Sequence, residues 1–230
     1  MSLKSVVLAD GDRPRATALD EAWPGWRDEV ELVVAADGGV RLAADLGMAV
    51  DLWVGDGDSL GAKGLEELRA SGVPIVVAWQ DKDESDTELA ALAAVDRGAT
   101  DITILGALGG RRIDHALANL ALLAHPGLAE AQCRLLDEQV RITLLSAPAT
   151  DGWPARLLLT GRPGGLVTLL PFGGRVEGIV TEGLRYPLND EALDTGPARG
   201  LSNVRLVDRA SVSVRSGRLL VVESPASLSA

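Results

Sequence analysis

The sequence is poor in several residue types, and each shortage excludes a class of protein. Only one of the 230 residues is a cysteine, Cys133, so an internal disulfide framework is excluded and a reducing compartment is expected. No cluster of cysteine and histidine suggests a zinc site. Cys133 stands in an apolar context, which indicates a structural thiol rather than a nucleophile.

Long apolar runs and excess positive charge are also missing. No segment approaches the roughly 18 consecutive apolar residues that span a bilayer, and the N-terminus lacks the apolar stretch of a signal peptide. The net charge is −11, which argues against nucleic acid or an anionic membrane as the main partner. We therefore expect a cytoplasmic protein with no nucleic-acid partner and no membrane partner.

Two well-known nucleotide-binding signatures are absent as well. There is no G-x-x-x-x-G-K-[S/T], and the glycines at 55, 57 and 61 miss the G-x-G-x-x-G spacing by one residue. A nucleotide site in this chain would have to be of another type. The five tryptophans are expected in a core or an interface.

The first part of the chain alternates short apolar runs with helical patterns. This alternation predicts an α/β domain over residues 1–133, with a mostly parallel sheet and helices on both faces. Ligands of such sheets bind beyond the carboxyl ends of the strands. Strands are expected over Leu3–Ala9, Val30–Ala36, Asp51–Val54, Val73–Trp79 and Asp101–Leu105, and helices over Val40–Leu46, Leu65–Ala70, Thr87–Arg97 and Asp114–Ala124.

The pattern changes from Arg134 onward. Short strand-like runs separated by glycine and proline, without a convincing helix, predict an all-β sandwich over residues 134–230. Ser216-Gly217 is expected to form a two-residue hairpin turn between the last two strands.

The stretch Val54-Gly55-Asp56-Gly57-Asp58-Ser59 is the first candidate site. Asp56 and Asp58 follow an expected strand, and in an extended backbone their side chains point to one side, about 6–7 Å apart. A polar turn explains the pair as well as a metal site does. Asp37, at the end of another expected strand, favours metal, because a cation neutralises a cluster of carboxylates. Mg²⁺ suits such oxygen ligands.

Two further stretches could meet phosphate. Ser85 and Glu88 form a capping box at a helix start, and a helix N-terminus also suits phosphate. There Asp86 would take metal. Lys82 could supply positive charge to a phosphate or be an ordinary solvated lysine. The glycines and arginines of Gly106–Arg112 form a possible phosphate cradle. Asp114 could instead cap the next helix, His115 is expected to pack against the sheet, and Asn119 shares its helix face.

These stretches in this order resemble the thiamine pyrophosphokinase family. The matching strings are Ala36–Gly39, Val54–Ser59, Lys82–Asp86, Gly110–His115 with Asn119, Gly183–Leu188 and Gly200–Asn203. The chain departs from the family at Gly57, where relatives usually carry an aromatic residue, and at Ser85, where they usually carry threonine. Arg111 leaves open which arginine contacts phosphate, and the spacing to Asp114 favours Arg112.

The resemblance implies an enzyme that moves pyrophosphate from ATP to the hydroxyl of thiamine, with Mg²⁺, giving thiamine diphosphate and AMP. It implies an N-terminal domain that binds ATP and Mg²⁺, a C-terminal β-sandwich, and a homodimer with thiamine held between the two chains. In a family member, catalysis would rest on Asp56, Asp58, Asp86, Asp114 and Arg112. Mg²⁺ would be held by Asp56, Asp58 and Asp86.

The remaining roles also come from the resemblance. Asp37 would support the metal or contact thiamine, and Asp114 would orient Arg112 or assist the attacking hydroxyl. Tyr186 would stack on thiamine, with Ser202 and Asn203 hydrogen-bonding it. ATP or metal contacts are expected at Asp37, Gly38, Lys82, Ser85, Arg112 and Asn119. A pyrophosphokinase for another alcohol, such as a hydroxymethylpterin, and a non-catalytic binding sensor are the alternatives.

Overall fold

The computed structural model describes residues 2–79, 82–147 and 155–226. The chain divides into two compact units, Met1–Glu138 and Gln139–Ala230. The sequence placed this boundary after Cys133, but strand β6 (Gln132–Leu136) pairs in parallel with β5 (Ala99–Leu105). The run Arg134–Leu136, which the sequence assigned to the β domain, is therefore the last strand of the first unit.

The first unit is built on a parallel sheet, as the alternating pattern predicted. Its strands lie in the order β6-β5-β1-β2-β3-β4, and all five pairings between neighbouring strands are parallel. The remaining strands of this sheet are β1 (Leu3–Leu8), β2 (Val30–Ala36), β3 (Leu52–Gly55) and β4 (Ile75–Val77). The order reverses between β1 and β5, which makes the gap between their carboxyl ends a topological switch point.

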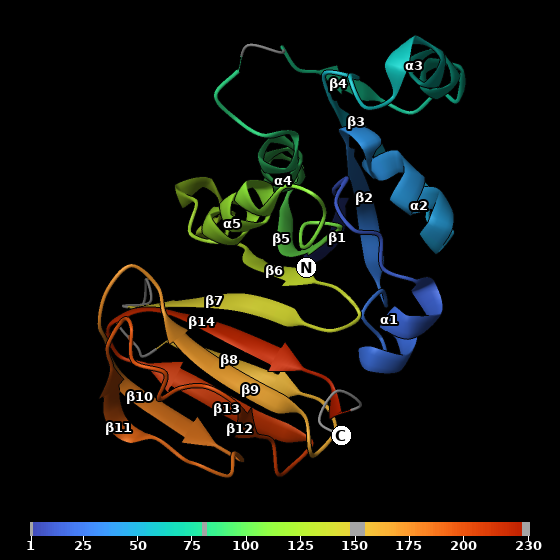
Figure 1. Cartoon of the computed structure of the whole chain (residues 1–230). Coiled ribbons are helices and arrows are strands. Elements are labelled where there is room, and N and C mark those ends of the chain that lie inside the picture. The colour runs from blue at the N-terminus through green and yellow to red at the C-terminus, as the bar shows by residue number, and fades with distance from the viewer. Residues whose placement is uncertain (1, 80–81, 148–154, 227–230) are drawn as a thin grey trace. The chain divides into compact units, whose positions relative to one another are not determined.

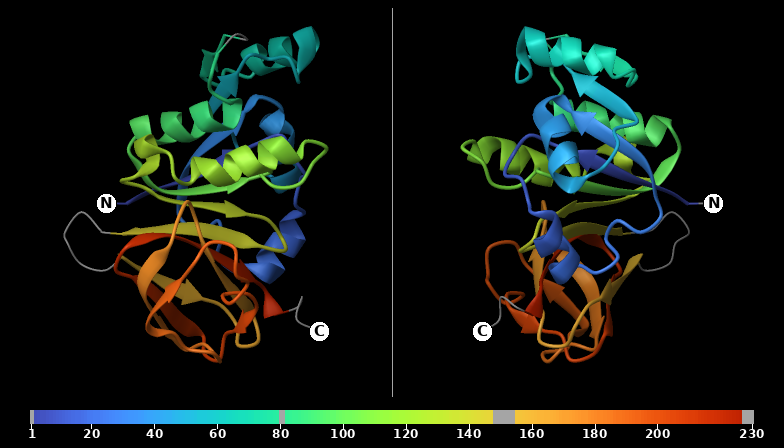
Figure 2. Two further views of the ribbon diagram at one scale, coloured as in Figure 1. Left: turned by 60° about the vertical axis from the view of Figure 1, so that its left-hand side comes forward. Right: turned by 90° about the vertical axis from the view of Figure 1, so that its right-hand side faces the viewer.

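Helices cover both faces of this sheet, as Figures 1 and 2 show. They are α1 (Ala16–Ala22), α2 (Val40–Leu46), α3 (Gly61–Ala70), α4 (Asp86–Asp96) and α5 (Ile113–Leu122), with 3₁₀ turns η1 (Asp37–Gly39) and η2 (Pro126–Leu128). Leu19 of α1 and Leu42 of α2 pack with Val6 and Leu8 of β1. In the described residues, no helix is both long and apolar enough to cross a bilayer.

Local signals in the sequence explain where several helices begin and end. Gly47 takes the left-handed conformation, at φ 65°, directly after α2, a conformation that costs glycine little. The Ser85 hydroxyl accepts the Glu88 main-chain N–H at 3.1 Å and caps α4. The buried face of α4 consists of alanines, at positions 90, 91 and 94.

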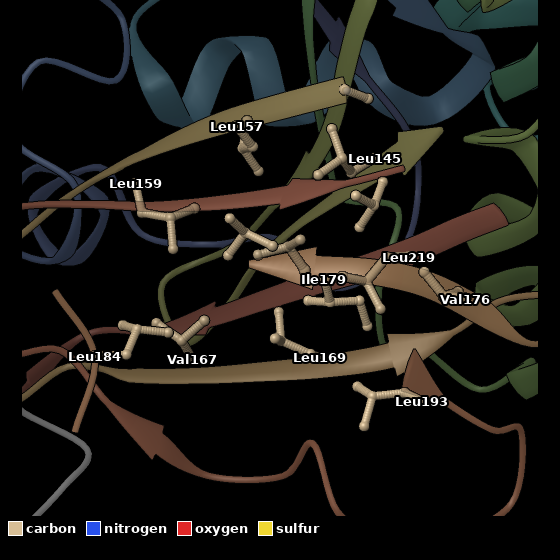
Figure 3. Packing of buried hydrophobic residues seen from close by; sticks show 14 of the residues in the cluster. Leu145, Leu157, Leu159, Val167, Leu169, Val176, Ile179, Leu184, Leu193 and Leu219 are labelled. Atoms are coloured by element: carbon tan, nitrogen blue, oxygen red, sulfur yellow. The ribbon is translucent and has the colours of Figure 1, made fainter. Parts of the chain in front are cut away.

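The second unit is an antiparallel β-sandwich. Its two sheets have the strand orders β12-β9-β14-β7 and β11-β10-β13-β8. Leucine, isoleucine and valine side chains from both sheets form one core (Figure 3). The strands are β7 (Arg141–Ala147), β8 (Ala155–Thr160), β9 (Leu166–Pro171), β10 (Val176–Glu182), β11 (Asn189–Leu193), β12 (Asn203–Val204), β13 (Arg209–Val214) and β14 (Gly217–Ser224).

The predicted hairpin at Ser216-Gly217 is wrong. Strand β13 pairs with β10 and β8, whereas β14 pairs with β7 and β9. The two strands therefore belong to opposite sheets, and the short connection carries the chain from one sheet to the other. Gly217 has φ 97°, and a Cβ there would lie 2.8 Å from the Arg175 carbonyl oxygen. A glycine is thus required here, because the main chain at Arg175 passes too close for a Cβ atom.

Candidate active site

The carboxyl edge of the parallel sheet gathers the acidic loops of the first unit. Asp37 follows β2 directly, Asp56 follows β3, and Asp86 begins α4, the helix after β4. Parallel strands all end at the same edge, so residues far apart in sequence meet there. The order of the strands, which the sequence did not give, places β2 beside β3.

Asp37 is the most constrained residue of the site. It has φ 41°, a strained value for a residue other than glycine, and is only 4% exposed. Its carbonyl oxygen accepts the Trp53 indole N–H at 2.9 Å. Carboxylate oxygen Oδ2 accepts the Ser59 main-chain N–H at 3.2 Å, whereas buried Oδ1 has no hydrogen-bond partner among the described residues. Burial raises the pKa of the Asp37 carboxyl above its ordinary value.

Asp37, Asp56 and Asp58 form a group in which one carboxylate oxygen from each residue lies within 4.8 Å of the other two. Oδ1 of Asp56 accepts the Asp58 main-chain N–H at 3.0 Å, which fixes the turn. Three carboxylates this close repel one another, and one of their oxygens has no partner in the part of the chain that the structure describes. A hard divalent cation would remove the repulsion and supply the partner. The sequence predicted Asp56 and Asp58 as metal ligands and Asp37 as a support for the metal or a thiamine contact, and the structure brings an oxygen of each together.

Gly57 stands between the two carboxylates with φ 84°. A Cβ built there would lie 3.4 Å from the Leu65 methyl groups of α3, which is ordinary contact. The backbone conformation, rather than lack of space, is therefore what favours glycine at this position. An aromatic residue here would strain the turn in the conformation that this chain adopts.

Asp86 lies outside the group of three and is bonded to Lys82. The Lys82 ammonium donates to Asp86 Oδ1, and both side chains are largely buried. Asp86 is still close enough that its charge contributes to the raised pKa of Asp37. Of the three predicted metal ligands, the structure thus groups Asp56 and Asp58 and pairs Asp86 with a lysine.

The glycine-rich segment after β5 is held by hydrogen bonds to its carbonyl oxygens. The Gly11 main-chain N–H donates to the Gly106 carbonyl oxygen at 2.8 Å, and the Asn119 side-chain amide donates to the Ala107 carbonyl oxygen at 2.9 Å. Asn119 is therefore buried and engaged with this loop. His115 is exposed, so its predicted packing against the sheet is wrong.

Arg112 and Asp114 form an exposed ion pair at the start of α5. The Arg112 Nε donates to Asp114 Oδ1 at 2.9 Å, and Nη2 donates to Oδ2. This hydrogen-bonded guanidinium lowers the pKa of the Asp114 carboxyl to about 2. Of the two adjacent arginines, Arg112 is the one whose orientation Asp114 fixes.

In the second unit, the predicted thiamine contacts lie together. The Asn203 side chain is bonded to both main-chain groups of Tyr186, accepting its N–H at 3.0 Å and donating to its carbonyl oxygen at 2.7 Å. The Tyr186 side chain is 63% exposed. Ser202 has φ 55°, and its main-chain N–H donates to the Thr168 hydroxyl at 3.0 Å. Asn203 thus holds the segment that presents Tyr186.

Sequence reasoning missed Asp10 and Arg41 at the same edge. Asp10 follows β1, and its Oδ1 lies 3.6 Å from the Arg41 guanidinium of α2. The string Asp10-Gly11-Asp12 repeats the Asp-Gly-Asp of the opening motif at the end of another strand, so a signal for Asp10 was present. Nothing in the local pattern singles out Arg41.

The cysteine expectation is confirmed, and the tryptophan expectation is confirmed for two of the five residues. Burial raises the pKa of the Cys133 thiol to about 12, as befits a structural cysteine. Trp23 and Trp53 are buried, whereas Trp79 is 86% exposed in the single chain. Trp153 lies outside the described residues.

Two family models match the chain, one on each unit. Residues 25–135 match "Thiamin pyrophosphokinase, catalytic domain", and residues 159–219 match "Thiamin pyrophosphokinase, vitamin B1 binding domain". The chain is 26% identical over 200 residues to a thiamine pyrophosphokinase of Bacillus subtilis, an alignment that covers 87% of this chain and 90% of that protein.

Solved structures of such proteins have the same fold. The Bacillus subtilis thiamine pyrophosphokinase structure has a TM-score of 0.80 at 24% identity, covering 96% of this chain and 99% of that one. A thiamin pyrophosphokinase family protein from Enterococcus faecalis has a TM-score of 0.76 at 26% identity, covering 97% and 99%. The yeast thiamin pyrophosphokinase has a TM-score of 0.72 at 16% identity, covering 98% and 87%.

Proposed function

Because the chain belongs to the thiamin pyrophosphokinase family of transferases, we propose that it moves the pyrophosphoryl group of ATP to the hydroxyl of thiamine. The products are thiamine diphosphate and AMP, and the reaction depends on Mg²⁺. The observation that carries the proposal is the group formed by Asp37, Asp56 and Asp58, with its unpartnered buried oxygen, inside the segment matched by the catalytic-domain model.

The residues at this edge fit magnesium. Asp56 and Asp58 would hold the ion together with Asp86, and Asp37 would support it. Bound there, Mg²⁺ neutralises the phosphate oxygens of ATP and the charge that develops on them during transfer. Converging carboxylates 4.8 Å apart or less repel one another when no cation is between them, which supports this assignment.

Positive groups around the edge bind the phosphates. The Lys82 ammonium is bonded to the Asp86 carboxylate in this structure. When Asp86 turns to the metal, the ammonium becomes available to bind a phosphate. The Ser85 hydroxyl and the start of α4 offer donors beside it. The Arg112 guanidinium binds phosphate through two N–H···O hydrogen bonds, while Asp114 orients it. Gly38 and Asn119 contribute by shaping the loops around the nucleotide.

Thiamine binds against the second unit. Tyr186 offers an exposed aromatic ring for stacking, and Ser202 and Asn203 lie beside it. We further propose a cytoplasmic homodimer in which each thiamine site takes Tyr186 from one chain and the acidic edge from the other. The match of residues 159–219 to the vitamin B1 binding model supports the assignment of thiamine to this unit.

Product analysis tests the proposal. The protein is incubated with ATP, Mg²⁺ and thiamine, and the nucleotides and thiamine esters are separated by chromatography. We expect AMP and thiamine diphosphate in equal amounts, and neither in EDTA. ADP as the nucleotide product contradicts pyrophosphoryl transfer, AMP formed only with a hydroxymethylpterin contradicts thiamine as substrate, and tight ATP binding without AMP indicates a sensor.

Variants of the carboxylates test the metal assignment. Asp58→Asn keeps the size of the side chain but removes the charge that holds magnesium, so turnover should fall by at least about 10²-fold, the scale of losing one electrostatic contact in a transition state. Asp96→Asn, an exposed carboxylate at the end of α4, is the matched control and should leave turnover unchanged. Full activity in Asp58→Asn contradicts the metal role.

A further inference from the structure

The loop that carries Asp56 and Asp58 is held by its own Ser59. The Ser59 main-chain N–H donates to Asp37 Oδ2 at 3.2 Å, and its hydroxyl donates to Asp58 Oδ1 at 3.2 Å. The Ser59 carbonyl oxygen accepts a hydrogen bond from the Arg41 Nη2. Both main-chain groups of Ser59 are thus fixed by side chains that follow β2, the N–H by Asp37 of η1 and the carbonyl oxygen by Arg41 of α2.

Arg41 is itself held by Asp10. The Arg41 Nη1 lies 3.6 Å from Asp10 Oδ1, and the two side chains are 45% and 37% exposed. The Asp10 carboxylate lies against the main chain of Gly38, where a Cβ would come within 2.1 Å of Asp10 Oδ2. Position 38 has no room for a side chain, because the Asp10 carboxylate occupies that space. From the same place the carboxylate lies close to the Arg41 guanidinium.

A cation beside an acidic site has two opposite effects on a bound metal. Its charge repels a divalent cation, so through space Arg41 weakens metal binding. Its hydrogen bond to Ser59 fixes the loop that presents Asp58, so through geometry Arg41 strengthens metal binding. The orientation of the guanidinium toward a main-chain carbonyl, rather than toward the Asp56 or Asp58 carboxylate, favours the second effect.

We propose that Arg41 is a positioning residue for the magnesium site. It is braced by Asp10 and clamps the Asp56–Ser59 loop through the Ser59 carbonyl oxygen. The inference rests on the magnesium part of the proposed function. It gives the Asp10-Gly11-Asp12 loop at the switch point a role in shaping the neighbouring site. It also explains why a glycine stands at position 38 without invoking a contact with a ligand.

The test uses the sign of the effect on metal affinity. Mn²⁺ serves as a paramagnetic substitute for Mg²⁺, and free Mn²⁺ is counted by electron paramagnetic resonance in titrations of the full chain without nucleotide. A clamp predicts that Arg41→Met weakens Mn²⁺ binding by about 10-fold or more, the scale of losing a group that orients metal ligands. A merely electrostatic Arg41 predicts tighter binding, which would overturn the proposal.

Three further variants sharpen this measurement. Arg41→Lys keeps the charge but lacks the forked guanidinium, so it should weaken Mn²⁺ binding in the same direction. Asp10→Asn should weaken it in the wild type but add nothing to Arg41→Met, because Asp10 acts through Arg41. The matched control is Arg13→Met, since Arg13 also joins the β1 loop to α2 by an ion pair, with Asp45 at 2.6 Å. It should leave Mn²⁺ affinity unchanged.

Hydrogen exchange gives an independent readout. Peptides covering residues 56–59 should exchange faster in Arg41→Met than in the wild type and at the wild-type rate in Arg13→Met. If Arg41→Met leaves the exchange rate of these peptides unchanged, the clamp is overturned, even if the variant binds Mn²⁺ weakly. A wild type that fails to bind Mn²⁺ and also makes AMP without divalent metal contradicts the proposed metal site. Wild-type Mn²⁺ binding that Arg41→Met leaves untouched contradicts only the role of Arg41.

Discussion

At the scale of single residues, Asp37 shows how this site trades stability for function. Its backbone is strained, its carboxylate is buried, and one carboxylate oxygen lacks a partner among the described residues. Each of these features costs stability in the absence of a ligand. Such residues are typical of binding sites, where the ligand supplies the interaction that the fold withholds.

Asp37→Asn should therefore stabilise the metal-free protein. Asparagine keeps an oxygen for the Ser59 N–H, tolerates positive φ and carries no charge. At neutral pH without divalent metal, the free energy of unfolding should rise by about 1 kcal/mol, measured by urea titration. The same variant should lose most of the stabilisation that Mg²⁺ gives the wild type.

The pH dependence of this gain follows from the raised pKa of Asp37. Between the unfolded and the folded pKa the native state binds more protons than the unfolded state, so wild-type stability falls as pH rises through that window. Below the ordinary value of 3.8, both states are protonated and the advantage of Asp37→Asn should shrink. A gain that grows as the pH falls would contradict this account.

At the scale of elements, the β-sandwich is joined by a buried charged network. Glu223 of β14 is only 2% exposed. Its carboxylate accepts two hydrogen bonds from Arg141 of β7, at 2.7 and 2.8 Å, and one from Arg205 at 2.5 Å. Arg205 also donates to the Leu159 carbonyl oxygen of β8, so the network connects strands of both sheets. Burial lowers the pKa of the Arg205 guanidinium, and Glu223 is the anion that holds its charge there.

Glu223→Gln should destabilise the sandwich strongly. It removes the charge that neutralises the buried Arg205 guanidinium, a kind of change that costs about 3–5 kcal/mol in other proteins. Urea unfolding followed by far-ultraviolet circular dichroism measures the loss. The matched control is Glu177→Gln, which breaks an ion pair with Arg175 whose side chains are about half exposed and should change stability little. Equal effects of the two variants would show that burial of the network is unimportant.

At the scale of the whole molecule, the residues proposed for the reaction are divided between two units. The first carries the carboxylates, the lysine and the arginine, and the second carries Tyr186 with Asn203 behind it. Each unit has its own apolar core. The proposed function needs both sets of residues at one site, either within one chain or from two chains.

Complementation distinguishes these arrangements. In a homodimer with shared sites, Asp58→Asn and Tyr186→Ala inactivate different halves of each site. A heterodimer of the two variants, isolated with two different affinity tags, then contains one intact site and should show about half the wild-type turnover. Each variant alone should remain dimeric by light scattering and nearly inactive. An inactive heterodimer would place the whole site within one chain, and a monomeric wild type would contradict the shared site.

Local sequence determined much of this protein. The strand and helix periods, the Gly47 stop and the Ser85 cap depend on neighbours within a few residues, so their positions follow from the chain alone. The resemblance in ordered motifs likewise identified the family, and the family matches confirm it.

Tertiary structure decided how those pieces meet. The sequence placed Asp37 after one strand and Asp56 and Asp58 after another, and the pairing of β2 with β3 is what brings an oxygen of each together. It read the turn at Ser216 as a hairpin, because local turn chemistry does not say whether the next strand pairs with the last one or crosses to the other sheet. Arg41 and Asp10 gained their roles in the same way, since a hydrogen bond to a carbonyl 18 residues away leaves no periodic trace in the sequence.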